Sequence, residues 1–185
     1  MEYGEGVGVF MSKITPYNGS RDARFVTVRR GGTLEDAQHC LLAAWAADCA
    51  EHVLDYFNSQ RPDDDRPRRA IERARAWARG EISMTQARES AYAAHAAARE
   101  ASGAAREAAR AAGHAVATAH MADHELGAAA YAIRAVRAAS PADMRDEAGR
   151  SECEWQRKRL PEAIRALVLS DESLRNQKLW SLFEC

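Results

Sequence analysis

Long apolar runs are absent from this chain of 185 residues. Its mean hydropathy is −0.49, and arginines interrupt the alanine tracts, so no window approaches the roughly 18 unbroken apolar residues of a membrane span. The N-terminus carries Glu2 and Glu5 rather than a basic start followed by an apolar run, which argues against a secretory signal. We therefore expect a cytoplasmic protein with no membrane partner.

Cysteine is scarce as well. The four cysteines, Cys40, Cys49, Cys153 and Cys185, contain no CxxC pair and no metal-finger spacing. In a cytosolic protein such cysteines are reduced thiols. The sequence accordingly predicts no structural metal and no cofactor.

The chain also lacks an excess of charge of one sign. Lys and Arg number 26 against 27 Asp and Glu, which gives a formal net charge of −1. Domains that bind nucleic acid are usually strongly basic, and the aromatic residues that would stack on bases make up only 7% of this chain. We expect no nucleic-acid partner.

Recognisable catalytic signatures are missing. The sequence contains no Ser/His/Asp pattern, no GxSxG turn, no glycine-rich phosphate loop and no kinase signature. We assign no catalytic residue, and a role other than catalysis is the leading hypothesis.

Alanine is what the sequence has in abundance. It fills about half of the positions in the stretch 86–139, and alanine is the strongest helix former. Small side chains also let helix backbones approach closely, so this stretch should form the tight centre of a helical protein. Breaks at Ser102-Gly103 and near Ala122-Asp123 divide it into predicted helices over 84–101, 103–121 and up to 139.

Helical signals continue on both sides of that centre. Thr33 with Asp36 and Ser83 with Gln86 have the form of capping boxes, and apolar residues recur every three or four positions from 34 to 57. Further helices are predicted over 66–79, from 141 to about 159, and after Pro161, with Ser170-Asp171 capping a short last one. The tail, including Trp180, should then fold onto the core.

These signals predict an all-α fold. We expect a compact single-domain bundle of about seven or eight helices with an alanine-rich centre. Residues 1–22 should be a loose leader and 23–185 the helical domain. The alternation of bulky and polar residues over 24–30 predicts a short strand or extended segment, which would pair across a homodimer or lie flat on helices.

Two groups of acidic residues are candidates for contact with a partner. Asp48, Glu51 and Asp55 lie on one side of the helix predicted over 34–57, and Asp63, Asp64 and Asp65 precede the next helix. The first group could equally be the solvated side of an amphipathic helix, and the second could be capping residues.

Histidines supply a second set of candidates. His95 and Arg99 are four residues apart, as are His120 and His124, and His114 lies on the helix between these pairs. Two imidazoles at this spacing share a helix face, as zinc ligands would require. The alternatives are a small catalytic pocket, or a structural hydrogen-bond network that includes Tyr92.

Long segments of the chain resemble the bacterial putative immunity protein family, which is related to the immunity-five-like domains of polymorphic toxin systems. The resemblance covers roughly residues 23–183. It is carried by RFVTVRRGGTL, AAWAADCAEHVL, RPDDDRPRRAIE, ARAWARGE, AYAAHAAARE, ARAAGHAVATAHM, LGAAAYAIRA and EWQRKRLPEAIRALVLSDESLRN.

The resemblance implies a small α-helical protein that neutralises a cognate toxin by binding it. It brings no catalytic residues with it. Our leading expectation is therefore a protein-binding module that uses Asp48, Glu51, Asp55, Asp63, Asp64 and Asp65. The alternative is a small enzyme or metal-binding protein that uses a pocket of His95, Arg99, His114, His120 and His124.

Overall fold

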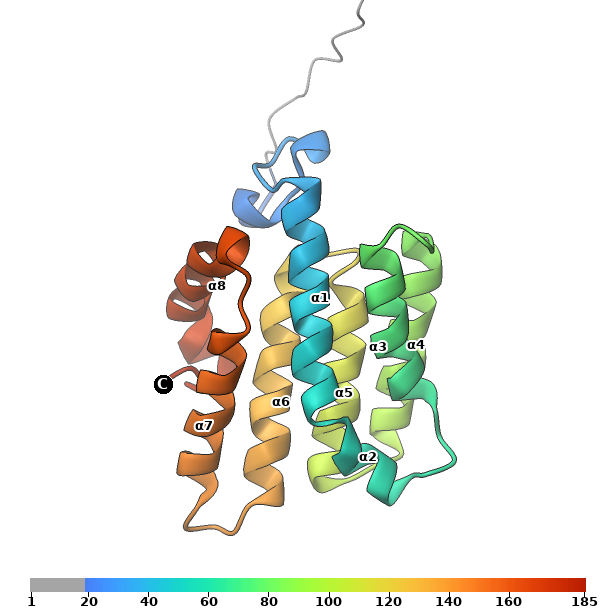
Figure 1. Ribbon diagram of the computed structural model, residues 1–185, viewed down its shortest axis with the longest axis vertical. Coiled ribbons are helices and arrows are strands. Elements are labelled where there is room, and N and C mark those ends of the chain that lie inside the picture. The colour runs from blue at the N-terminus through green and yellow to red at the C-terminus, as the bar shows by residue number, and fades with distance from the viewer. Residues whose placement is uncertain (1–18) are drawn as a thin grey trace, which may run out of the picture.

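A computed structural model describes residues 19–185, which form an all-α bundle with eight α-helices and no β-strand in that range (Figure 1). The helices are α1 Asp36–His52, α2 Leu54–Gln60, α3 Arg66–Ala78, α4 Met84–Arg99, α5 Gly103–Ala117, α6 Glu125–Ala139, α7 Arg145–Lys158 and α8 Glu162–Arg175. The predicted fold class is confirmed. Residues 1–18 of the predicted leader lie outside the described part of the chain.

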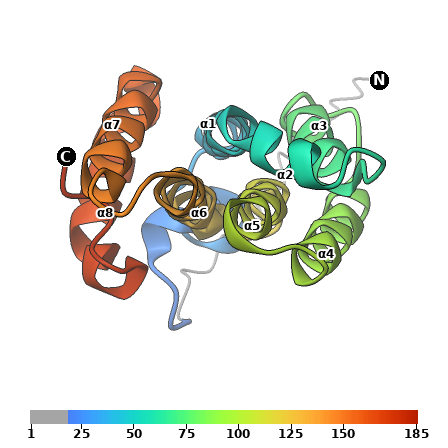
Figure 2. The same ribbon diagram turned by 90° about the horizontal axis from the view of Figure 1, so that it is seen from below.

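Helices α5 and α6 form the centre of the bundle. Helix α5 packs against α1, α2, α3, α4 and α6, while α6 also contacts α1 and α7 (Figure 2). The α5–α6 and α4–α5 pairs are the most extensive, and all three helices come from the alanine-rich stretch. Small side chains therefore set the close spacing at the centre, as the sequence predicted.

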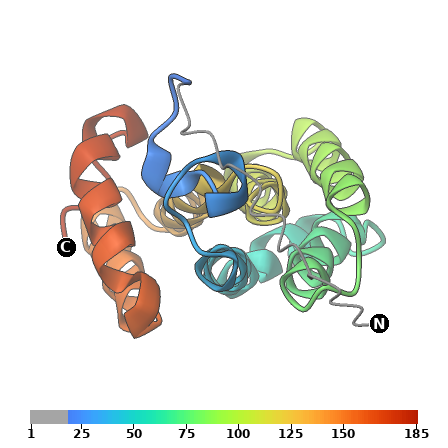
Figure 3. The same cartoon turned by 90° about the horizontal axis from the view of Figure 1, so that it is seen from above.

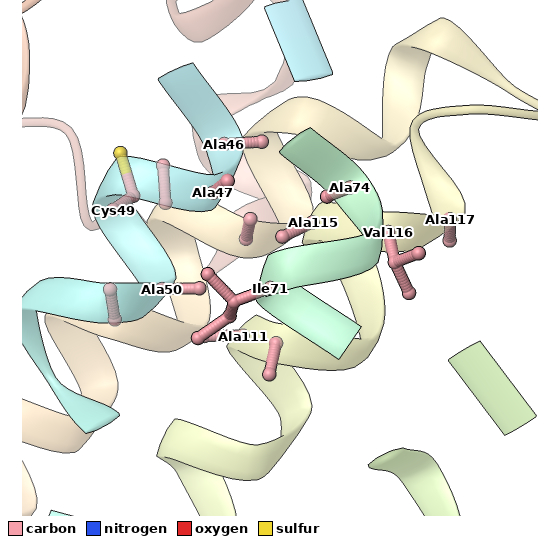
Figure 4. Packing of buried hydrophobic residues seen from close by; sticks show 14 of the residues in the cluster. Ala46, Ala47, Cys49, Ala50, Ile71, Ala74, Ala111, Ala115, Val116 and Ala117 are labelled. Atoms are coloured by element: carbon pink, nitrogen blue, oxygen red, sulfur yellow. The ribbon is translucent and has the colours of Figure 1, made fainter. Parts of the chain in front are cut away.

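Alanines fill the contact between helices α1 and α5. Ala46 and Ala50 of α1 pack toward Ala111 and Ala115 of α5, with Ile71 of α3 inserted beside them (Figure 4). All five side chains are at most 2% exposed. A larger residue at any of these alanines would have to displace a neighbouring helix, because protein interiors contain few voids.

A few large side chains anchor the outer helices to this centre. The buried Trp45 of α1 donates its indole N–H to the carbonyl of Gln156 at 3.0 Å. The Gln156 side chain in turn donates to the carbonyl of Ala129 at 3.2 Å, so one polar chain joins α1, α7 and α6. Buried polar groups need such partners, and this one also fixes the position of α7.

The predicted helix starts are partly confirmed. The capping box of Ser83 and Gln86 is present at the start of α4. The box predicted at Thr33 is wrong, because the backbone N–H of Thr33 instead donates to the carbonyl of Ala23 at 3.0 Å. Glu35 and Gln38 form the capping box of α1. The single helix predicted over 34–57 is likewise divided, with a break at Val53.

The N-terminal segment lies across one end of the bundle, above α1, α5 and α6 (Figure 3). It forms two 3-10 turns, Ala23–Phe25 and Val28–Arg30, joined by the extended residues Val26 and Thr27. An isolated bridge pairs Thr27 with Leu34. The strand alternative is therefore wrong, because the segment folds back onto its own chain instead of pairing along its length.

The C-terminal part differs from prediction in two ways. Helix α8 continues to Arg175 instead of ending at Ser170, since the buried carboxylates of Asp171 and Glu172 bind Arg175 and Arg157. Cys153 and Cys185 form a disulfide, with their Cα atoms 6.0 Å apart. The prediction of four reduced thiols is wrong for this pair, because the returning tail brings together two cysteines separated by 32 positions.

Candidate functional site

The acidic residues predicted on α1 and α2 are largely engaged within the molecule. Arg75 of α3 donates to Asp48 at 2.7 Å and to both carboxylate oxygens of Glu51 at 2.9 and 2.7 Å. Hydrogen bonding to Arg75 lowers the pKa of Glu51. Asp55 accepts a hydrogen bond from the Asn58 amide at 3.2 Å.

The acidic run between α2 and α3 is also paired in part. Asp64 receives two hydrogen bonds from the Arg66 guanidinium, at 2.8 and 2.7 Å, and these lower its pKa. Asp65 lies 3.8 Å from Arg69. Asp63 is exposed and forms no ion pair within residues 19–185. Much of the negative charge in both predicted groups is therefore balanced by nearby arginines.

The histidines, in contrast, are brought together into one row. Ring centroids lie 5.2 Å apart for His95 and His114, 5.3 Å for His114 and His124, and 5.2 Å for His120 and His124. The row crosses from α4 over α5 to the α5–α6 connection. Helix α5 ends at Ala117, so His120 and His124 meet through that connection and not on one continuous helix, as the spacing had suggested.

Two glycines make room for the rings. A Cβ atom at Gly113 would lie 2.5 Å from Cε1 of His95, and one at Gly127 would lie 2.5 Å from Nδ1 of His114. Real Cβ contacts are essentially never that short. Each imidazole therefore packs directly on the backbone of the neighbouring helix, which explains glycine inside two alanine-rich helices.

The surroundings of the row keep its members neutral. Burial lowers the pKa of His95 to about 4 and that of His114 to about 3, and the charge of Arg110 acts in the same direction on both. The Nδ1 atoms of His95, His114 and His120 are buried without a hydrogen-bond partner. The predicted hydrogen-bond network is therefore wrong: the contact is ring against ring, and Tyr92 bonds to Arg88 instead.

The chemistry of the row is that of uncharged imidazole rings. No three His, Cys, Asp or Glu side chains among the described residues are placed to hold a metal ion. Among the described residues, no carboxylate pairs with His95 or His114 to orient or charge them, and the charge of Arg110, which acts on both, is cationic. What the row does provide is a rigid, neutral aromatic surface.

Aromatic side chains extend the row toward the C-terminus. Tyr131 of α6 stacks on His114 with centroids 5.1 Å apart, and Trp180 lies 5.6 Å beyond Tyr131. The Arg134 guanidinium lies 4.2 Å from the Trp180 ring centroid. Trp180 is 51% exposed, whereas the buried tail residues are Leu182 and Phe183. The expectation that Trp180 packs into the core is wrong, because its left-handed backbone, with φ 61°, turns the chain there.

Arginines surround these rings, and together they form what we call the arginine–aromatic face. Its members are Arg88, Tyr92, His95, Arg99, Arg106, Glu107, Arg110, His114, Tyr131, Arg134 and Trp180. Arg88, Arg99 and Arg110 form no ion pair with any described residue. The one carboxylate of the set, Glu107, is buried between Arg106 at 2.7 Å and Arg134 at 2.9 Å. The face is cationic as a result.

The sequence carries a signal for part of this face. Arg88, Tyr92, His95 and Arg99 recur at spacings of four, three and four, which places them on one side of α4. Of these, only His95 and Arg99 were predicted as site residues. Trp180 had no comparable signal. In Figure 2, α4 and α8 lie beside the side of α5 and α6 that is opposite α1, and away from the N-terminal segment no described α-helix covers that side.

Comparison with models of known protein families found one match. The family model described as Imm-5 like putative immunity protein matches residues 32–163, which is more than half of the chain. No curated protein and no solved structure matches it. Among the described helices, none is long and apolar enough to cross a membrane.

Proposed function

We propose that this chain, which belongs to the Imm-5 like putative immunity protein family, neutralises a protein toxin by binding it through the arginine–aromatic face. The observation that carries this proposal is the continuous contact from His95 through His114 and Tyr131 to Trp180 on one side of the bundle. Family membership supports a toxin as the kind of partner.

The composition of the face suits a protein interface. Trp, Tyr and Arg dominate the few residues that carry most of the binding energy in such interfaces. Tyr92 and Trp180 are 61% and 51% exposed, so they are available to a partner. The His95 and His114 rings are already held against glycine backbone, so binding would order few additional side chains.

The charge of the face indicates an acidic partner surface. Arg88, Arg99 and Arg110 are not neutralised within the described chain, and complementary charge steers association and excludes wrong partners. The acidic groups are weaker candidates because Arg75 and Arg66 already balance Asp48, Glu51 and Asp64. Binding through the face should weaken as salt concentration rises.

Co-expression with a candidate toxin, followed by titration calorimetry of the purified pair, tests the proposal. Trp180→Gly and Arg110→Ala should each lower affinity about tenfold or more, since both remove central contacts. Glycine suits the left-handed backbone at position 180, so Trp180→Gly should remain folded. Tyr56→Ala and Arg68→Ala are matched controls on other helices and should bind normally.

Two results would overturn the proposal. The first is the absence of both a complex and rescue from the toxin. The second is unchanged affinity in both face variants together with a loss in Asp55→Asn or Asp63→Asn, which would transfer the contact to the acidic residues.

A further inference from the structure

We propose that a cavity at the N-terminal end of the bundle binds a small organic phosphate with a flat ring, such as a nucleoside monophosphate. We call it the N-terminal pocket. Its volume is about 450 Å³, within the range of about 300 to 1,000 Å³ that small-molecule sites occupy. The pocket is lined by arginines and by large apolar side chains, among them Arg21, Arg29, Arg30, Phe25, Trp77 and Met84.

The charge of the lining selects for an anion. Three arginines line the pocket, and among the described residues no carboxylate does; one of the three, Arg21, pairs with Asp123 at 3.4 Å just outside the lining. Arg30 forms no ion pair with any described residue, and the pair between Arg29 and Asp36, at 3.1 Å, is largely exposed to solvent. Exposed pairs are weak, so these guanidinium groups can rearrange around a ligand at low cost. Their planar forks match the oxygens of a phosphate.

The remaining walls select for a flat apolar group. Phe25, Trp77 and Met84 line the cavity together with small alanines. The orientation of Trp77 is fixed, because its ring packs at 61° against the ring of His39, with centroids 4.7 Å apart. His39 is itself held by a 2.7 Å hydrogen bond between Nε2 and the carbonyl of Thr118. Phe25 and His39 are buried and support the wall from behind, whereas the Trp77 ring is partly exposed, so an aromatic base can contact Trp77 while its phosphate meets the arginines.

Backbone hydrogen bonds hold the segment 25–34, which covers the pocket, in one conformation. Val26 accepts from the backbone N–H of Leu34 at 3.0 Å, and Val28 donates to the carbonyl of Leu34 at the same distance. At Gly32, a Cβ atom would lie 2.0 Å from the carbonyl oxygen of Val26, so only glycine fits. The arginines are therefore presented by a tightly folded segment, which reduces the entropy lost on binding.

This inference is independent of the proposed function, because the pocket shares no residue with the arginine–aromatic face. Titration calorimetry of the purified full-length protein, without any toxin, tests it with four probes: AMP, adenosine, inorganic phosphate and benzoate. AMP should bind at one site per chain. Adenosine and phosphate should each bind at least about tenfold more weakly, since each lacks one half of the recognised chemistry.

The double variant Arg29→Ala/Arg30→Ala should lower AMP affinity about tenfold or more, and thermal stabilisation by AMP should fall with it. The matched control, Arg68→Ala/Arg69→Ala on α3, should bind AMP like the parent. Absence of AMP binding at millimolar concentration, or equal binding by the double variant, would overturn the proposal. Binding of benzoate as tight as that of AMP would overturn the assignment to phosphate.

Discussion

At the scale of single residues, glycine decides how the histidine row fits. Gly113 and Gly127 lie inside helices, where glycine is less favourable than alanine by roughly 1 kcal/mol. That intrinsic cost is offset by ring packing that no other residue would allow at these two positions. The two glycines that interrupt the alanine pattern are therefore required for the packing of His95 and His114.

We expect Gly127→Ala to destabilise the protein by about 1 to 3 kcal/mol despite the better helix propensity of alanine, because the His114 ring must move out of its position. Urea denaturation measures this free energy of unfolding. The matched control is Gly149→Ala in α7, where the new Cβ would lie 3.1 Å from the flexible side chain of Arg137. If both variants have the same stability, the ring at position 114 is not fixed by its glycine.

The same scale shows how the fold changes the availability of individual acidic residues. Asp48 and Asp64 look available in the sequence, yet each meets an arginine at 2.7 Å in the fold. Arg110 looks like an ordinary surface residue of an amphipathic helix, but it lies close enough to His95 and His114 to lower the pKa of both. Asp64 is paired with Arg66, two positions away, whereas the partner of Asp48 is Arg75 on another helix, so the availability of Asp48 could be judged only from the fold.

At the scale of elements, the C-terminal tail depends on a covalent tie to α7. The disulfide between Cys153 and Cys185 is reinforced by Arg157, which donates to the carbonyls of Cys185 and, at 3.1 Å, of Phe183. Leu182 and Phe183 are buried as a result, and Trp180 is presented at the surface. The tail is therefore a structural element in its own right, although it contains no long helix.

We expect Cys185→Ser to lower the free energy of unfolding by about 3 to 4 kcal/mol, the value that the chain-entropy model gives for a closed loop of this length. A reducing agent should lower the stability of the parent to a similar degree. It should leave the variant unchanged, because Cys40 and Cys49 are free thiols. Equal stability of the oxidised parent and the variant would show that the tie contributes nothing.

At the scale of the whole molecule, buried histidines and buried carboxyl groups have opposite effects on the free energy of unfolding as the pH falls. The folded-state pKa of His95 is about 4 and that of His114 about 3, below the roughly 6.5 of an unfolded histidine. The unfolded chain binds more protons in that interval, so these groups lower stability as pH falls from 6.5. Burial raises the pKa of Glu125 and Glu172, so these carboxyls act in the opposite direction above pH 4.5.

A comparison of the parent with His114→Gln separates these effects. Between pH 7 and pH 5 the parent should lose about 2 kcal/mol more stability than the variant, because the variant lacks the His114 imidazole, whose protonation the fold opposes, while both proteins keep the other histidines. Urea denaturation at both pH values measures the difference. An identical loss in the two proteins would mean that His114 is not buried as a neutral ring.

Much of the molecule could be predicted from residue patterns alone. Alanine content and capping signals gave the helical class and most of the helices, because these are local properties of the backbone. The predicted helix boundaries were wrong where a tertiary contact replaced the expected cap. The backbone N–H of Thr33 donates to the carbonyl of Ala23, and at Ser170 the helix α8 continues because the buried Asp171 and Glu172 bind arginines. The candidate site was predicted only in its histidines and Arg99, which have regular spacing.

The sequence by itself therefore determined an all-α bundle with an alanine-rich centre, since helix propensity and apolar spacing act over a few residues. The tertiary structure alone decided which cysteines pair, which surface is left cationic and aromatic, and which charges are neutralised by another helix, as Asp48 is by Arg75. Each of these depends on side chains tens of residues apart meeting in space. His95, Tyr131 and Trp180 share one face only because α4, α6 and the returning tail pack beside one another.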